Sequence, residues 1–149
     1  MSGRIVVGVD GSDGARSALE WAAAEARLRG AALLAVHTWD IPPLTTGAGP
    51  FDPPSTLNAG LLERVEQGAH QLVERELAAV DTSGLEIDKR VEARNPADAL
   101  LDAARGADLL VVGTRGHGGF SGLLLGSVSQ QVSHHAPCPV VIVPRPDKE

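Results

Sequence analysis

The sequence predicts an α/β protein, a single doubly wound domain whose five-stranded, mostly parallel sheet carries helices on both faces. Short apolar runs rich in β-branched residues alternate along the chain with longer segments of helical periodicity. Strands and helices that alternate in this way form right-handed crossovers, which place helices on both faces of a parallel sheet. The length of 149 residues, without an internal repeat, indicates one domain over residues 1–149.

The first two strands and the helix between them follow from local signals. An apolar run over residues 4–9 ends at a turn and predicts a buried strand. Residues 13–29 repeat alanine and leucine at three- and four-residue steps, which predicts a helix. Ser12, or the aspartate after it, is the expected N-cap, and Gly30 is the expected C-terminal stop. Residues 31–39 form a second apolar run and predict a second buried strand.

The middle of the chain predicts a loop, a long helix and an exposed strand. Residues 40–56 contain five prolines and therefore form no regular element. Residues 57–80 show the longest helical pattern. Charged residues are expected on its solvated face, namely Glu63, Arg64, Glu66, Arg75 and Glu76. Residues 85–92 alternate apolar and polar residues, which predicts a half-exposed strand toward a sheet edge.

The last third of the chain predicts two helices and two strands around a glycine-rich loop. A helix begins at Asn95-Pro96 with a cap followed by proline and continues over residues 95–105. Residues 107–112 form a third fully apolar strand, and residues 113–125 are rich in glycine. Residues 126–135 predict the last helix, and residues 139–143, bracketed by prolines, predict the final strand.

The composition excludes several classes of function. Thirteen Lys and Arg against 19 Asp and Glu give a net charge of −6, without the basic cluster that nucleic-acid binding requires. The apolar runs are far shorter than the roughly 20 residues of a membrane-spanning helix. The single cysteine, Cys138, and the lack of a signal-peptide layout at the N-terminus favour a cytoplasmic protein.

The loop after the fourth strand has the features of a phosphate-binding site. Four glycines in residues 113–119 let backbone N–H groups approach an anion closely. Arg115 and His117 add donors, and the helix that follows directs its N-terminus at the same place. Ser127 and Ser129 add hydroxyls. Because ligands of open α/β sheets bind at the carboxyl ends of the strands, this loop and the turn after the first strand form the candidate site.

Other phosphate-binding and catalytic motifs are missing from the sequence. A Walker loop needs Gly-Lys-Ser/Thr, but both lysines, Lys89 and Lys148, follow aspartate. The Gly-x-Gly-x-x-Gly dinucleotide motif and the Gly-x-Ser-x-Gly nucleophile elbow do not occur. His134, His135 and Cys138 match no standard zinc spacing, so we expect no metal site built from protein ligands alone.

Structural explanations compete with the functional ones at single residues. Asp10 can end the first strand and cap the next helix without any role in binding. His37 follows an apolar strand and can be a hydrogen-bonded core histidine. Cys138, between two prolines, has no partner base and is expected to serve packing.

The glycine spacing resembles that of a known family. Gly113 is followed after two residues by Gly116 and after nine more by Gly126-Ser127. With Val-Gly-Val-Asp-Gly-Ser at residues 7–12 and Pro-Cys-Pro-Val at residues 137–140, the chain resembles the universal stress protein family, specifically its ATP-binding branch. The resemblance covers essentially the whole chain and implies a Rossmann-like fold.

The resemblance implies a ligand, a set of contacts and an assembly. The ligand that the resemblance implies is ATP, accompanied by Mg²⁺. Asp10 would lie by the ribose or the phosphate-bound ion, and the adenine would be bordered by the backbone of Val36 and His37. The ribose and phosphates would be wrapped by Gly113, Arg115, Gly116 and His117. The phosphate tail would be held by Gly126, Ser127, Val128 and Ser129. The family also implies a homodimer that pairs through the final strand.

Three functions fit the sequence. The first is an ATP-binding regulatory or stress-response protein that acts through nucleotide occupancy and dimer surfaces. The second is a slow ATP hydrolase or phosphotransferase, for which Asp10 and His117 are the only candidate bases, so that no catalytic residue is assigned. The third is an interaction module that binds no nucleotide, and the intact glycine spacing argues against it.

Overall fold

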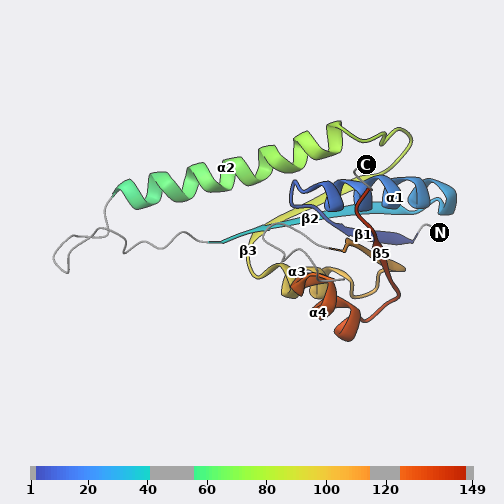
Figure 1. Cartoon of the computed structure of the whole chain (residues 1–149). Helices are drawn as coiled ribbons and strands as arrows, with labels where there is room; N and C mark the ends of the chain where they lie inside the picture. The colour runs from blue at the N-terminus through green and yellow to red at the C-terminus, as the bar shows by residue number, and fades with distance from the viewer. Residues whose placement is uncertain (1–2, 41–55, 115–124, 147–149) are drawn as a thin grey trace.

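The computed structural model describes residues 3–40, 56–114 and 125–146. Its five strands form one sheet in the order β3-β2-β1-β4-β5, and all four pairings among them are parallel (Figure 1). The strands are β1 (Arg4–Gly8), β2 (Ala32–Trp39), β3 (Ile87–Ala93), β4 (Leu109–Gly113) and β5 (Val140–Val143). The helices are α1 (Asp13–Arg29), α2 (Thr56–Ala78), α3 (Pro96–Ala103) and α4 (Ser127–His135). The expected class and order of elements are confirmed, with a sheet that is parallel throughout.

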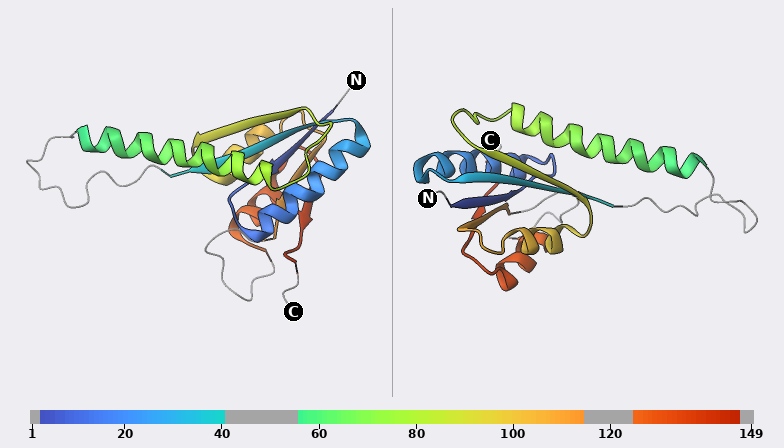
Figure 2. Two further views of the ribbon diagram at one scale, coloured as in Figure 1. Left: turned by 90° about the horizontal axis from the view of Figure 1, so that it is seen from above. Right: turned by 180° about the vertical axis from the view of Figure 1, so that it is seen from behind.

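Two hydrophobic clusters, one on each face of the sheet, hold the helices in place. Alternate residues of a strand point to opposite faces, so β1 contributes Ile5 and Val7 to one cluster and Val6 to the other. The first cluster joins α1 and α2 to the sheet, and the second joins α3 and α4. Figure 1 shows these two helix layers above and below the strands. The second view of Figure 2 shows α2 running out past the end of β2.

Helix ends follow the local signals that the sequence contains. Ser12 is the N-cap of α1, and Gly30 ends the helix in the left-handed region at φ 66°. A left-handed residue at this position favours glycine, which has no Cβ to clash. Asn95 caps α3, and its side chain accepts a hydrogen bond from the N–H of Asp98 at 3.2 Å. These signals act within a few residues, which is why they could be read before the fold was known.

Glu76 of α2 corrects one expectation. We expected its side chain on the solvated face, but it is 2% exposed and lies against α1. Arg16 donates to both of its carboxylate oxygens, at 3.1 Å and 2.6 Å. The hydrogen bonds and charge of Glu76 raise the pKa of Arg16 above its ordinary value. A paired carboxylate therefore holds α2 against α1 where the helical pattern predicted solvent.

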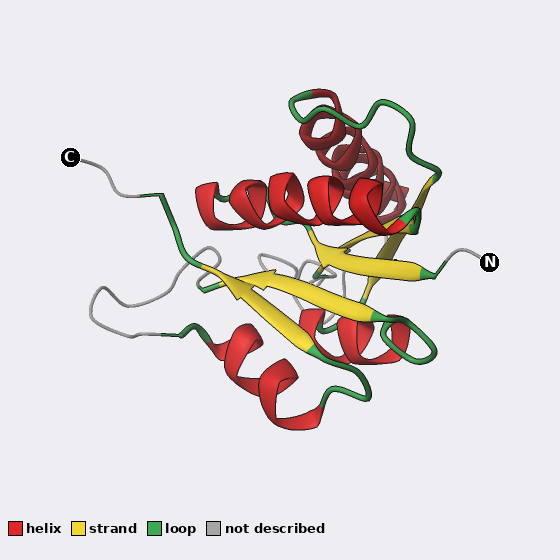
Figure 3. Cartoon of the chain, turned by 90° about the vertical axis from the view of Figure 1, so that its right-hand side faces the viewer, coloured by secondary structure: helices red, strands yellow, loops and turns green. Residues whose placement is uncertain are grey.

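Figure 3 shows the strands between the two helix layers, and the two strands at the edges of this sheet, β3 and β5, differ in composition. At one edge, β3 is partly exposed as the sequence predicted, but the consecutive polar residues Asp88, Lys89 and Arg90 interrupt its alternation between Ile87 and Val91. At the other, all four residues of β5 are branched aliphatics that pack partly against the two hydrophobic clusters. Within the described ranges, no helix has both the length and the apolar character needed to cross a bilayer.

Candidate functional site

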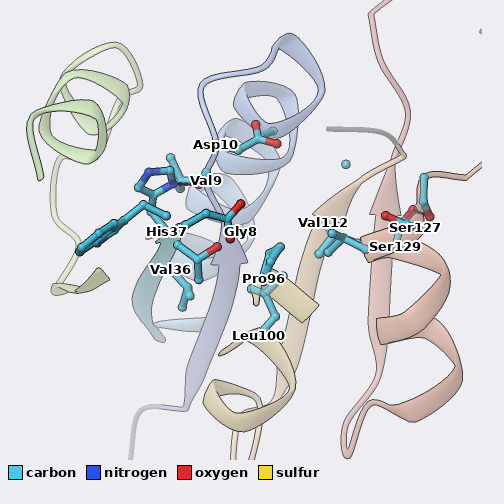
Figure 4. Close-up of a pocket in the computed structure, with 17 residues that line it drawn as sticks. Gly8, Val9, Asp10, Val36, His37, Pro96, Leu100, Val112, Ser127 and Ser129 are labelled. Atoms are coloured by element: carbon cyan, nitrogen blue, oxygen red, sulfur yellow. Dashed lines mark hydrogen bonds between the residues drawn. The ribbon is translucent and has the colours of Figure 1, made fainter. Parts of the chain in front are cut away.

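A cavity of about 290 Å³ lies at the carboxyl ends of β1, β2 and β4 (Figure 4). Such a volume is close to the lower end of the range for small-molecule pockets, roughly 300–1,000 Å³. β1 and β4 are neighbours from which the chain proceeds in opposite directions across the sheet. This switch in direction is the place where open α/β sheets bind ligands. The position of the cavity therefore agrees with the site that the loops predicted.

Asp10 organises the turn between β1 and α1. Its Oδ1 accepts hydrogen bonds from the N–H of Ser12 at 2.8 Å and from the hydroxyl of Ser12 at 2.5 Å. That hydroxyl oxygen accepts in turn from the N–H of Ala15 at 3.1 Å and so caps α1. Asp10 thus acts on the helix through Ser12, the true cap. Asp10 also lines the cavity, so its role in the turn does not exclude contact with a ligand.

His37 is tied to the neighbouring strand segment by its ring. The Nδ1 atom lies 2.7 Å from the carbonyl oxygen of Val9. Because a carbonyl can only accept, Nδ1 carries a proton and donates it, which makes Nε2 the acceptor in the neutral ring. The carbonyl of Val36 accepts from the N–H of Val9 at 2.8 Å. His37 is therefore the hydrogen-bonded structural histidine that we considered, although it also lines the cavity.

The N-terminus of α4 forms the opposite wall of the cavity. Its N-cap is Gly126, which has no side chain to accept hydrogen bonds from the first turn. The first N–H groups of an α-helix have no partner inside the helix, and the described residues supply no other acceptor to those of Ser127, Val128 and Ser129, which can therefore donate to a ligand. They also carry the positive end of the helix dipole. This wall suits an anion such as a phosphate.

The Ser129 hydroxyl, expected to hold the phosphate tail, is used within the protein. Ser129 is 3% exposed, and its Oγ lies 2.9 Å from the carbonyl oxygen of Thr114 and 3.1 Å from that of Gly126. The N–H of Gly126 also donates to the Thr114 carbonyl, at 2.6 Å. A hydroxyl has one hydrogen to donate, and here it points to backbone carbonyls. Ser129 thus joins the start of α4 to the end of β4.

Gly113 has a packing role that the glycine pattern did not reveal. A Cβ atom at this position would lie 2.8 Å from the backbone carbon and oxygen of Gly14 in the first turn of α1. Separations under 3.0 Å do not occur for real Cβ atoms, so a side chain at position 113 would force α1 and β4 apart. A side chain at Gly113 would therefore disturb the packing of α1 on β4 as well as any contact with a ligand.

Apolar residues that we did not select complete the cavity. Pro96 and Leu100 of α3 lie below the end of β1 in Figure 4. Trp39, the last residue of β2, also lines the cavity. Its place at the carboxyl end of a parallel strand is a sequence signal for this site. Pro96 and Leu100 had no such signal, since only the packing of α3 under the sheet brings them there.

The expected site residues fall into two groups. Those within the described ranges all line the cavity: Asp10, Val36, His37, Gly113, Gly126, Ser127, Val128 and Ser129. The other three, Arg115, Gly116 and His117, lie outside the described residues. The cavity thus combines a carboxylate, an open helix N-terminus and an apolar wall.

His134 and His135 end α4, and Cys138 follows two residues after the Ala136 that caps it. Within the described residues, no group of three or more His, Cys, Asp or Glu side chains is placed to hold a metal ion. Partial burial, and to a lesser extent the charge of Asp108, raise the pKa of the Cys138 thiol. A raised pKa lowers the thiolate fraction at neutral pH, and the thiolate is the reactive form. Cys138 therefore has the chemistry of a packing residue.

Sequence relatives span the whole fold. A protein of *Thermus aquaticus* named as a universal stress protein is 41% identical over 141 residues, covering 93% of this chain and 96% of its own. A universal stress protein of *Mycolicibacterium smegmatis* is 37% identical over 145 residues, which make up 93% of this chain and 45% of the relative. The chain thus spans less than half the length of some relatives and nearly all of others.

Solved structures with the same fold cover nearly the full chain. The universal stress protein UspA of *Lactobacillus plantarum* is 26% identical with a TM-score of 0.77, over 95% of this chain and 97% of its own. A universal stress protein in complex with cAMP is 27% identical with a TM-score of 0.64, over 97% and 98% of the two chains. One from *Archaeoglobus fulgidus* in complex with dAMP is 26% identical with a TM-score of 0.55, over 94% and 96%.

The model of one protein family accounts for almost every residue of the sheet and its helices. The match runs over residues 1–144 and so includes both walls of the cavity and all five strands. Together with the relatives at 37–41% identity, this establishes that the chain belongs to the universal stress protein family.

Proposed function

We propose that this protein binds ATP in the cavity and acts as a nucleotide-dependent regulatory or stress-response protein. The observation that carries the proposal is the N-terminus of α4, whose N–H groups face the cavity behind a glycine cap. Structural neighbours in complex with cAMP and dAMP support an adenine nucleotide as the ligand class. The Asp10 carboxylate adds a hard oxygen donor, the kind of ligand that Mg²⁺ prefers. When bound, Mg²⁺ would neutralise phosphate charge.

We expect bound ATP to persist, because the described walls hold few groups for phosphoryl transfer. That chemistry relies on positive charge around the γ-phosphate and a group that orients the nucleophile. Within the described part of the chain, the residues lining the cavity include neither lysine nor arginine. Typical kinases run at roughly 1–100 per second with the complete set. We therefore propose ligand occupancy, rather than turnover, as the output of the site.

We also propose a homodimer that pairs through β5. Val140 and Ile142 pack on one face of the sheet, Val141 and Val143 on the other, and β5 stands at the end of the strand order. An apolar edge strand invites pairing unless it is covered. Pairing with a second copy about a two-fold axis covers it by one repeated interface. The free thiol of Cys138 suits a reducing compartment, and we place this dimer in the cytoplasm.

The dimer can be tested by changing a backbone group of β5 that points away from β4. The carbonyls of Pro139 and Val143 accept from β4 and the residue after it, so the backbone of Val140 and Ile142 points to the outer edge. Sedimentation at micromolar concentration should give twice the 15.4 kDa of one chain. Replacing Ile142 by proline removes an outward donor and should give monomers. A monomeric parent protein at this concentration would contradict the proposal.

Nucleotide binding is tested on the purified protein. Mass spectrometry of the material released by denaturation should detect ATP, and the emptied protein should bind ATP in a calorimetric titration with Mg²⁺. Turnover is measured on the same sample. A rate of about one per second or faster would favour the enzyme instead. Protein that neither carries nor binds any adenine nucleotide would leave the interaction module as the function.

A further inference from the structure

We propose that Trp39 is the base-stacking residue of the site, so that its indole selects for a nucleotide with a large aromatic base and reports on occupancy. This inference rests on the proposed function, since it assumes that a nucleotide occupies the cavity. Trp39 is the last residue of β2 and lines the cavity together with Val36 and Pro96.

The width of the sheet places the base at β2 once the phosphates lie at α4. In the strand order, β1 separates β2 from β4, and α4 follows β4. Neighbouring strands lie about 4.8 Å apart, so the ends of β2 and β4 are separated by roughly 10 Å. A nucleotide that extends across the strand ends from α4 therefore brings its base toward β2. The carboxyl end of that strand is Trp39.

The chemistry of the two ends of the cavity agrees with this direction. The α4 end presents backbone N–H groups, and Asp10 lies after β1. The β2 side presents Val36 and Trp39, and the apolar Pro96 and Leu100 of α3 lie under the end of β1. A purine has two apolar faces and stacks well on an aromatic ring. The apolar end of the cavity is thus the end where a flat base is best accommodated.

The Trp39 side chain is only partly buried in the protein. Its indole is half-buried, and in the described part of the chain the apolar residues packed on either hydrophobic cluster do not include it. Its register partner on the neighbouring strand β3 is Ala93, whose side chain is too small to cover an indole. Large aromatic side chains dominate binding energetics when they are desolvated by a ligand. A half-covered indole at the apolar end of a cavity has the properties of such a binding surface.

Fluorescence gives the direct test, because the chain has only two tryptophans. Trp21 lies on α1 and is 36% exposed, and it does not line the cavity. In a Trp21→Phe background all indole emission comes from Trp39. ATP with Mg²⁺ should change that emission saturably, with the same Kd as calorimetry. Emission that stays constant while calorimetry shows ATP binding would overturn the inference and leave the proposed function standing.

Substitutions separate stacking from simple space filling. Trp39→Ala should weaken ATP binding by about 5- to 100-fold, the range for losing one base–aromatic stack. Trp39→Phe should retain most of the affinity, whereas Trp39→Leu, apolar but without a ring, should behave like the alanine variant. Thermal unfolding of the empty variants checks that each remains folded. Equal rescue by Phe and Leu would overturn stacking, and a parent protein that binds no nucleotide would remove both proposals.

Discussion

Two helices, α1 and α4, begin at the same cavity, but their N-termini are capped differently. The N-terminus of α1 has a side-chain cap, since the Ser12 hydroxyl accepts from the N–H of Ala15. The N–H of Ser12 in turn donates to the Asp10 carboxylate. α4 begins at Gly126, which has no side chain to cap the helix. An anion therefore meets a helix N-terminus with a side-chain cap at α1 and, among the described residues, one without such a cap at α4.

The contrast shows how a glycine at an N-cap can serve binding. A serine or aspartate at position 126 would stabilise α4 slightly more, because side-chain oxygens satisfy N–H groups that glycine leaves open. At φ −78° and ψ 174° the backbone of Gly126 is extended, a conformation that any residue adopts. Its own backbone angles thus do not require glycine. Leaving the first turn of α4 open to a ligand supplies a reason.

The largest effect is expected when a side-chain cap is added to the N-terminus of α4. Gly126→Asp places a carboxylate on the open N–H groups and repels phosphates, and like charges in contact cost several kcal/mol. We expect the Kd for ATP to rise at least ~100-fold, measured by calorimetry, with unchanged or slightly higher thermal stability. Gly126→Ala, which adds no oxygen, is the control and should lose much less affinity. Parent-like binding by the aspartate variant would place the phosphates elsewhere.

The close contact between α1 and β4 can be tested at two glycines that both line the cavity. At Gly113, alanine would bring Cβ to 2.8 Å from the backbone of Gly14, so we expect a loss of about 1–3 kcal/mol in unfolding free energy. At Gly8, alanine would bring Cβ to 3.4 Å from a Leu100 methyl, an ordinary contact. Urea denaturation should therefore separate the two variants. Equal stability would show that α1 adjusts freely.

Replacing the Asp10 carboxylate with an amide separates its role in the turn from its proposed role at the Mg²⁺ ion. Asp10→Asn keeps an oxygen that accepts from Ser12 but removes the charge, so the turn should survive. If Asp10 acts through the ion, ATP affinity with Mg²⁺ should fall by about tenfold, the loss of one charge-assisted contact of ~1.5 kcal/mol. With EDTA the variant and the parent protein should bind alike. An unchanged affinity in Mg²⁺ would restrict Asp10 to the turn.

The smallest effect is expected at the cap of α1. Ser12→Ala removes the hydroxyl that accepts from Ala15 and should lower the unfolding free energy by about 1 kcal/mol. Affinity for ATP should stay within about twofold, because the phosphates are assigned to α4. The exposed Ser127, at the first position of α4, is the matched control, and its alanine variant should keep parent stability. A larger loss of affinity in Ser12→Ala would make α1 part of the phosphate site.

Elements governed by short-range rules were predictable from the sequence. The helix over residues 13–29 was expected at the bounds that the structure has, because its cap and its stop lie next to it. The edge position of β3 followed from its alternation, and the apolar run of β5 followed from its composition. The carboxyl-end rule for parallel sheets then brought Asp10 and Gly126 to one site, since the rule depends on strand direction alone.

Contacts between elements far apart in the sequence were decided by the tertiary structure. The helical period placed Glu76 in solvent, but the packing of α2 on α1 buried it against Arg16, 60 residues away. Pro96 and Leu100 reach the cavity because α3 packs under β1, and Gly113 is constrained by the backbone of α1. A local pattern records which face of an element is apolar. The particular surface that the face meets depends on how the elements pack, which no single segment encodes.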